Sequence, residues 1–124
     1  EENWNQENIP FFEFEIEDTL QSYNLFFNIR HNKTYEWKNL WVFLQFELPG
    51  DLYDVDTLEF LLQDAQGRWL GNGSGNIRDG SFLFKRKTRF PFRGKYKASF
   101  EQAMRVETLE DITDIGFSIE EINE

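Results

Sequence analysis

The feature that most constrains this chain is an alternation of apolar and polar residues with a period of two, repeated along most of its length. Phe12, Phe14 and Ile16 alternate with three glutamates, and residues 95–100 repeat the pattern with lysine and serine at the polar positions. A period of two places one set of side chains on one face of a strand and the other set on the opposite face. The pattern therefore predicts half-buried β-strands.

The same pattern recurs in segments that are separated by turn signals about ten residues apart. The strands are expected at residues 12–17, 23–30, 40–44, 58–62, 68–70, 82–90, 95–100 and 115–120. About eight short strands without a long amphipathic helix predict an all-β fold, an antiparallel β-sandwich with jelly-roll or Greek-key-like connections. A closed barrel is the alternative. At most one short helix is expected, between Glu101 and Ile112, where the residue types favour helix.

The core is expected to consist of the apolar residues on one face of these strands. The predicted core residues are Phe12, Phe14, Leu25, Phe27, Val42, Leu44, Phe60, Trp69, Phe100 and Phe117. Residues 40–44 are apolar on both faces, which predicts a central strand that is covered on both sides. Residues 82–90 and 95–100 are expected to pair as a hairpin around the turn at Pro91 to Gly94.

The length and the local composition divide the chain into a tail and one domain. The 124 residues suit one domain of ordinary size. Residues 1–10 are polar and end in Pro10, which favours a flexible N-terminal tether. Residues 11–124 are therefore expected to form a single β-sandwich domain.

The charge and the cysteine count exclude several classes of site. With 13 basic and 23 acidic residues the net charge is −10, so the cationic surface typical of proteins that bind duplex nucleic acid is absent. The absence of cysteine excludes disulfides, thiolate metal sites and cysteine nucleophiles. Asp51, Asp54 and Asp56 could supply oxygen ligands to calcium, but their spacing is not that of an EF-hand, and we expect solvated carboxylates. No metal and no cofactor are predicted.

Catalytic groups are sparse, and we expect a protein that is not an enzyme. His31 is the single histidine, and no nucleophile elbow accompanies it. Glu13, Glu15 and Glu17 share a strand face, where carboxylates more often protect an edge than hydrolyse glycosides. The Gly71 to Gly75 segment resembles a phosphate-binding loop only in composition, because another strand and not a helix follows it. We expect a tight connection there.

Two groups of residues are candidates for binding a partner. Tyr35 and Trp37 lie in a polar loop, where exposed rings can stack on sugars or form a protein interface. A basic run along the predicted hairpin has seven members, Lys85, Arg86, Lys87, Arg89, Arg93, Lys95 and Lys97, and the second group of candidates is Arg86, Arg89, Arg93 and Lys95. The basic run is either a docking patch for an acidic partner or lipid headgroups, or it is neutralised by neighbouring glutamates such as Glu13 to Glu17.

Several segments, read in order, resemble the gliding-motility lipoproteins of the GldH family. The segments that carry the resemblance are YNLFFNIRH at residues 23–31, NLW at 39–41, Asp64 with GRWLGNGSG at 67–75, RFP at 89–91, EQAMR at 101–105 and DIG at 114–116. They span most of the predicted domain, and the glycine-rich segment is the most specific of them.

The resemblance implies a non-enzymatic component of the gliding machinery in a gram-negative cell envelope. It implies a periplasm-facing protein that is anchored in a membrane by a lipid on an N-terminal cysteine, which this segment lacks. The implied partners are other envelope proteins of the gliding-motility or protein-secretion apparatus, bound through protein–protein contacts. The resemblance implies no catalytic residue. A carbohydrate- or peptidoglycan-binding β-sandwich module is the alternative, which exposed and coplanar loop aromatics would favour.

Overall fold

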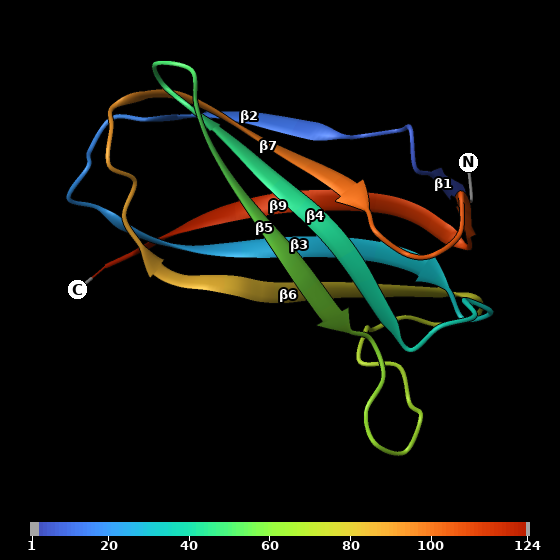
Figure 1. Ribbon diagram of the computed structural model, residues 1–124. Coiled ribbons are helices and arrows are strands. Elements are labelled where there is room, and N and C mark those ends of the chain that lie inside the picture. Colours follow the sequence, from blue (N-terminus) through green and yellow to red (C-terminus); the bar gives the residue numbers. More distant parts are fainter. Residues whose placement is uncertain (1–2, 124) are drawn as a thin grey trace.

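The computed structural model describes residues 3–123. The chain folds into an antiparallel β-sandwich (Figure 1). One sheet has the strand order β2-β7-β4-β5 and the other the order β6-β3-β9, while β1 and β8 form a two-stranded ribbon. The strands are β1 Asn3–Asn5, β2 Phe11–Ile16, β3 Ser22–Asn32, β4 Asn39–Leu48, β5 Leu52–Leu61, β6 Ile77–Thr88, β7 Gly94–Gln102, β8 Thr108–Glu110 and β9 Ile112–Ile122. The predicted fold class is confirmed.

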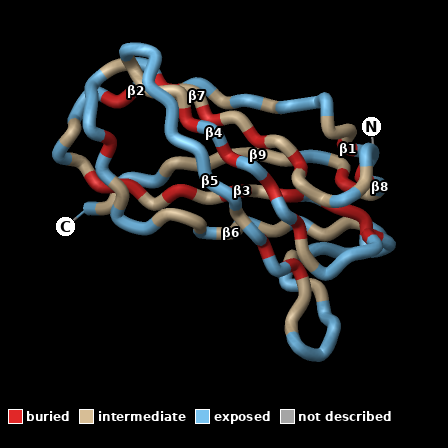
Figure 2. The backbone as a smooth tube through the Cα atoms, viewed as in Figure 1, coloured by how far each residue is buried: buried red, intermediate tan, exposed pale blue. Residues whose placement is uncertain are grey.

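The core lies between the two larger sheets and contains the residues that the alternation predicts (Figure 2). Leu25, Phe27, Val42, Leu44, Phe60 and Phe100 are buried, and Phe12, Phe14, Trp69 and Phe117 are partly buried and pack against them. Phenylalanine rings from both sheets meet in this layer, as where Phe27 of β3 stacks on Phe60 of β5 with ring centroids 4.6 Å apart. Aromatic contacts between the two sheets therefore hold the sandwich together.

No helix forms between Glu101 and Ile112, because β7 continues to Gln102 and β8 begins at Thr108; this agrees with the expectation of at most one short helix there. One buried side chain organises the loop between these strands. Gln102 Nε2 donates to the Val106 carbonyl oxygen at 2.9 Å, and Gln102 Oε1 accepts from the Met104 N–H at 2.9 Å. These local side-chain bonds satisfy backbone groups of the loop without a helix, which helix propensity cannot indicate.

The predicted tether differs from the structure at its described residues. Asn3–Asn5 form β1, which pairs with β8, and the side chain of Trp4 is buried. The indole N–H of Trp4 donates to the Asn8 carbonyl oxygen at 2.7 Å. The polar composition of the segment did not indicate this anchor, because a single buried tryptophan is enough to fix a short segment. Glu1, Glu2 and Glu124 lie outside the described residues.

The hairpin predicted from residues 82 to 100 is also wrong. β6 and β7 are consecutive in the chain but belong to different sheets, so residues 89–93 cross from one sheet to the other. Phe90 is buried in this crossover, and the Tyr96 hydroxyl donates to the Phe92 carbonyl oxygen at 2.7 Å and accepts from the Phe92 N–H. A hairpin and a crossover both point alternate residues into the same core, so the pattern does not distinguish them.

The expectation that β4 is covered on both sides is half right. β4 is central in its sheet, between β7 and β5, but only alternate residues from Leu40 to Phe46 are buried. Trp41 and Phe43 point away from the core and are 39% and 48% exposed. The described residues form only two large sheets and no helix, so no third layer covers this face.

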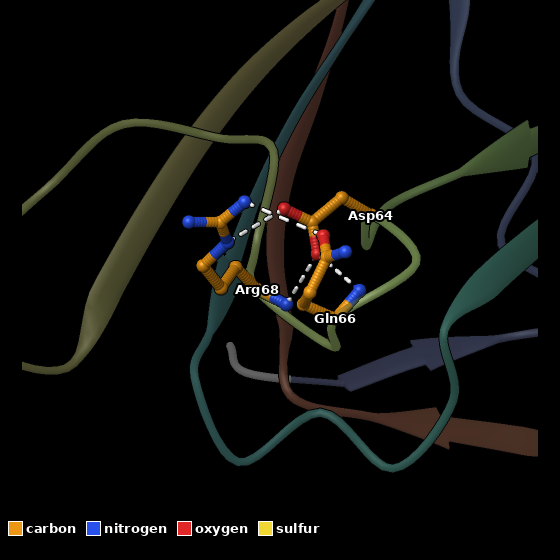
Figure 3. A network of polar contacts seen from close by, with 3 residues as sticks. All are labelled: Asp64, Gln66 and Arg68. Carbon is orange, nitrogen blue, oxygen red and sulfur yellow. Dashed lines mark hydrogen bonds and ion pairs between the residues drawn. The ribbon is translucent and has the colours of Figure 1, made fainter.

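The connection between β5 and β6 is a long loop that extends from one end of the sandwich (Figure 1). Asp64 organises its first turn by accepting bonds from the backbone N–H groups of Arg68 and Gln66 and from Arg68 Nε (Figure 3). These bonds, chiefly that from the Arg68 backbone, hold the pKa of the Asp64 carboxyl below its ordinary value. The tight connection predicted at Gly71 to Gly75 is confirmed at Gly73, where an added Cβ would lie 2.1 Å from the Ile77 carbonyl oxygen.

Candidate interaction surfaces

The outer face of the β2-β7-β4-β5 sheet carries a concentration of exposed apolar side chains, which we call the apolar face. Its members are Ile9, Phe11, Trp41, Phe43, Tyr53, Val55 and Leu61. A groove of about 650 Å³ crosses this face and is lined by Ile9 on one side, by Phe43 and Val55 on the other, and by the polar side chains of Gln45, Thr57, Ser99 and Glu101. Exposed apolar surface of this kind marks interaction sites more often than chance.

The two lysines of β7 lie among glutamates on the apolar face. Lys97 is the register partner of Glu13 on β2 and of Glu47 on β4, and Lys95 is the partner of Glu15. Opposite side chains on neighbouring strands lie close enough to interact, although neither lysine forms an ion pair within 4 Å with a residue of the described range 3–123. This arrangement favours neutralisation within the fold for the part of the basic run on β7.

The other predicted basic residues lie at one end of the sandwich. Arg86 is near the end of β6, and Arg89 and Arg93 are in the crossover to β7; all are exposed. Arg89 Nε lies 3.4 Å from Ser22 Oγ, and no carboxylate of residues 3–123 lies within 4 Å of these guanidinium groups. The crossover therefore presents positive charge outward. It lies at the opposite end from the loop with Trp37, so the predicted residues do not form one site (Figure 1).

The two predicted aromatic residues of the 33–38 loop have different surroundings. Tyr35 is buried, and its hydroxyl donates to the Asn39 carbonyl oxygen at 2.9 Å, so the prediction that it contacts a partner is wrong. Burial raises the pKa of this phenol. Trp37 is partly exposed and, together with Trp41, Met104 and Arg105, lines a hollow of about 530 Å³ beside the apolar face.

His31 has a structural environment. It is buried beside Tyr35 and Trp69, with its ring centroid 4.6 Å from that of Trp69. His31 Nδ1 lies 2.9 Å from the Asn32 carbonyl oxygen, which can only accept, so this nitrogen carries the proton. Burial is the main cause of a pKa below the ordinary histidine value. The neutral imidazole therefore anchors the loops at this end of the sandwich.

No metal centre is evident in the part of the chain that the structure describes. Within residues 3–123, no group of three or more histidines, aspartates or glutamates is arranged to hold a metal ion. Asp51 occupies the turn before β5, and Asp54 and Asp56 are spread along that strand. Likewise, no helix within this range is long and apolar enough to span a bilayer.

Sequence reasoning missed the apolar face as a candidate site, although a signal for it was present. The apolar run at residues 40–44 indicates that both faces of β4 need a cover, and the fold supplies one only on the core side. Val55 and Tyr53 gave no such signal, because their exposure depends on the register of β5 with β4, which places both side chains on the outer face.

Comparison with known proteins assigns the chain to a family. The family model described as GldH lipoprotein matches residues 1–119. This chain belongs to the GldH lipoprotein family. A gliding motility lipoprotein GldH homolog of Christiangramia forsetii is 36% identical over 94% of this chain and 76% of its own length. The gliding motility lipoprotein GldH of Flavobacterium johnsoniae is 36% identical over 95% of this chain and 77% of its own length.

No solved structure matches this member of the GldH family. The sequence matches to the family model and to the two relatives confirm the family resemblance that the ordered segments indicate. The β-sandwich described above shows how the strands of this member are arranged.

Proposed function

We propose that this GldH family member is a non-enzymatic, lipid-anchored and periplasm-facing protein of the cell envelope that acts in gliding motility by binding other envelope proteins. The names of the relatives support the role in motility and the lipid anchor. The observation that carries the interaction mechanism is the apolar face, where Phe43 and Val55 are 48% and 69% exposed beside a groove. Burying such a surface against a protein is favourable in proportion to its apolar area.

The test is to supply variants of this protein to gliding bacteria that lack their own GldH and to measure colony spreading. Phe43→Ser removes an aromatic ring from the apolar face and is expected to abolish spreading. Leu83→Ser is the matched control, because Leu83 is 38% exposed on the other sheet. Both variants should keep the parent's melting temperature and envelope abundance, since neither side chain is in the core. Normal spreading with Phe43→Ser would contradict the proposal.

A second candidate function is binding of carbohydrate or peptidoglycan. Trp37 and Trp41 favour it, because both residues are 39% exposed and line one hollow with Asn39 and Arg105. Sedimentation with purified peptidoglycan sacculi separates the two functions. We expect the parent protein to stay in the supernatant, and binding to sacculi that Trp37→Ala abolishes would favour the glycan.

The basic residues at the crossover are the third part of the proposal. We propose that Arg86, Arg89 and Arg93 form a separate, charge-dependent contact at the far end of the sandwich, with Lys95 mainly neutralised by Glu15. Surface charges steer association and respond strongly to salt. Reversing Arg86 and Arg93 to glutamate should reduce spreading without lowering the melting temperature, because neither side chain forms an ion pair with a residue of the range 3–123, and even exposed pairs contribute only about 0–1 kcal/mol each.

A further inference from the structure

β5 is an edge strand with an open side. It is the last strand of the β2-β7-β4-β5 sheet and pairs along all ten residues with β4 only. Within residues 3–123, no backbone hydrogen bond links β5 to a strand on its other side. Nearly every residue from Leu52 to Leu61 is exposed (Figure 2). An edge of this length is a template for pairing with another extended chain.

The backbone groups that face the open side can be assigned. The Leu62 N–H donates to the Lys38 carbonyl oxygen at 2.8 Å, which continues the pairing toward β4. Because backbone groups alternate sides along a strand, the odd-numbered residues of β5 present their N–H and C=O groups to the open side. The Thr57 N–H agrees with this phase, since it donates to the carboxylate of its neighbour Asp56 at 2.8 Å and not to β4.

The other three edges of the sandwich are irregular or short, whereas β5 is regular. β2 has six residues and follows Pro10. β6 has two register irregularities opposite β3 and a left-handed residue, Lys87, with φ of 52°. β9 has a register irregularity opposite Arg30 and His31. Such irregularities and short lengths hinder strand addition, and β5 lacks them because its register with β4 is unbroken.

The charges of β5 select what can pair with it. The strand carries Asp54, Asp56 and Glu59 and no basic residue, and none of the three forms an ion pair within 4 Å with a described residue. Pairing with β5 of a second copy would place carboxylates near carboxylates, in a chain with a net charge of −10. Asp54 and Asp56 share one face of β5, opposite to the face with Val55, and Glu59 lies on the face with Val55. An incoming strand with lysine or arginine on one face would meet Asp54 and Asp56 favourably. The edge therefore disfavours a second copy and favours a basic segment.

We propose that β5 docks an extended segment of a partner protein in which basic and apolar residues alternate, added as a further strand of the sheet. The backbone of the segment would bond to the odd-numbered residues of β5, and its apolar side chains would extend the cover over Val55 and the neighbouring Phe43. This inference rests on the proposed function, because it specifies how the apolar face and its edge engage an envelope protein. Strand addition derives affinity from backbone bonds and specificity from alternate side chains.

The direct test uses a synthetic ten-residue peptide of alternating lysine and valine, with alternating glutamate and valine as its matched control. We expect the lysine peptide to bind saturably and to slow hydrogen exchange at the amides of Tyr53, Val55 and Glu59 at least tenfold. The glutamate peptide should do neither. Lysine-peptide binding that leaves these amides unprotected would be simple charge attraction and would overturn the proposal, as would no binding.

Two variants separate the contribution of the β5 backbone to peptide binding from that of the Val55 side chain. Val55→Pro removes an N–H that faces the open side, without removing a bond to β4, and should weaken peptide binding at least tenfold. Val55→Ser loses the same apolar side chain but keeps the N–H, and should bind more tightly than Val55→Pro. Equal binding by the two variants would overturn strand addition. Should Val55→Pro fail to fold, the exchange measurement on the parent protein decides alone.

The same variants in gliding cells distinguish this inference from the proposed function. Loss of spreading with Phe43→Ser but normal spreading with a folded Val55→Pro would refute strand addition and leave the interaction role standing. Normal spreading with both variants would refute both. Protection of the β5 amides that grows with protein concentration, without peptide, would identify a second copy as the occupant and overturn the choice of partner.

Discussion

Phe100 in β7 is the residue at which the packing of the two sheets can be tested most directly. Its side chain is 0% exposed and contacts Phe12 of its own sheet and Phe27, Phe84 and Phe117 of the opposite sheet. Phe100→Ala would leave a cavity bounded by rings from both sheets, which cannot collapse without moving strands. Replacing a buried phenylalanine by alanine costs about 3–5 kcal/mol.

The expected shift in melting temperature follows from this loss of free energy of unfolding and from the length of the chain. With an unfolding entropy of about 2.1 cal/mol/K per residue and 124 residues, a loss of about 4 kcal/mol lowers the melting temperature by about 15 °C. A single domain has a total stability of about 5–15 kcal/mol, so the variant should remain folded at low temperature but with little reserve. Urea unfolding, followed by tryptophan fluorescence, measures the free energy directly.

Phe11→Ala is the matched control, because it makes the same chemical change on the apolar face. Phe11 is 56% exposed and contacts the Lys97 ammonium at 4.9 Å, so its loss should cost less than about 1 kcal/mol. A Phe100→Ala variant that loses no more free energy of unfolding than Phe11→Ala would refute the packing argument.

Two further predictions concern the end of the sandwich near the long loop. The pKa of His31 is lowered in the folded state, so the unfolded chain binds a proton more readily than the folded chain. The free energy of unfolding should therefore fall as the pH drops below about 6.5, and it should level off below the lowered pKa. Urea titrations at pH 7.5 and 5.5 should show a smaller difference for His31→Gln than for the parent; an equal difference would count against this assignment. Gly73→Ala should destabilise by more than about 1 kcal/mol, because its Cβ would lie 2.1 Å from the Ile77 carbonyl oxygen. Gly67→Ala should destabilise less, because nothing lies within 4 Å of the added Cβ and only the positive φ opposes the change. Thermal melts of the two variants measure this difference.

The candidate surfaces were predictable from the sequence only in part. Trp37 is partly exposed as its polar loop suggests, but Tyr35 from the same loop is buried, because its ring packs with His31 and Trp69 from other segments. The basic residues are clustered between Lys85 and Lys97 in the sequence, yet the crossover leaves Arg89 exposed at the end of the sandwich while the register places Lys97 between glutamates. Neighbours in space, which come from distant strands, decided these outcomes.

By itself the sequence determined the class of the fold and most of its core. A period of two fixes which side of a strand is apolar, and burial of that side is the dominant stabilising term, so residues such as Phe27 and Phe100 had to face the interior. Only the tertiary structure decided which strands are neighbours, because alternation is the same for a hairpin and for a crossover between sheets. The placement of β5 at an open edge depends on this pairing, and the exposure of Phe43 and Val55 depends on the register of β4 with β5 and on the absence of a third layer among the described residues.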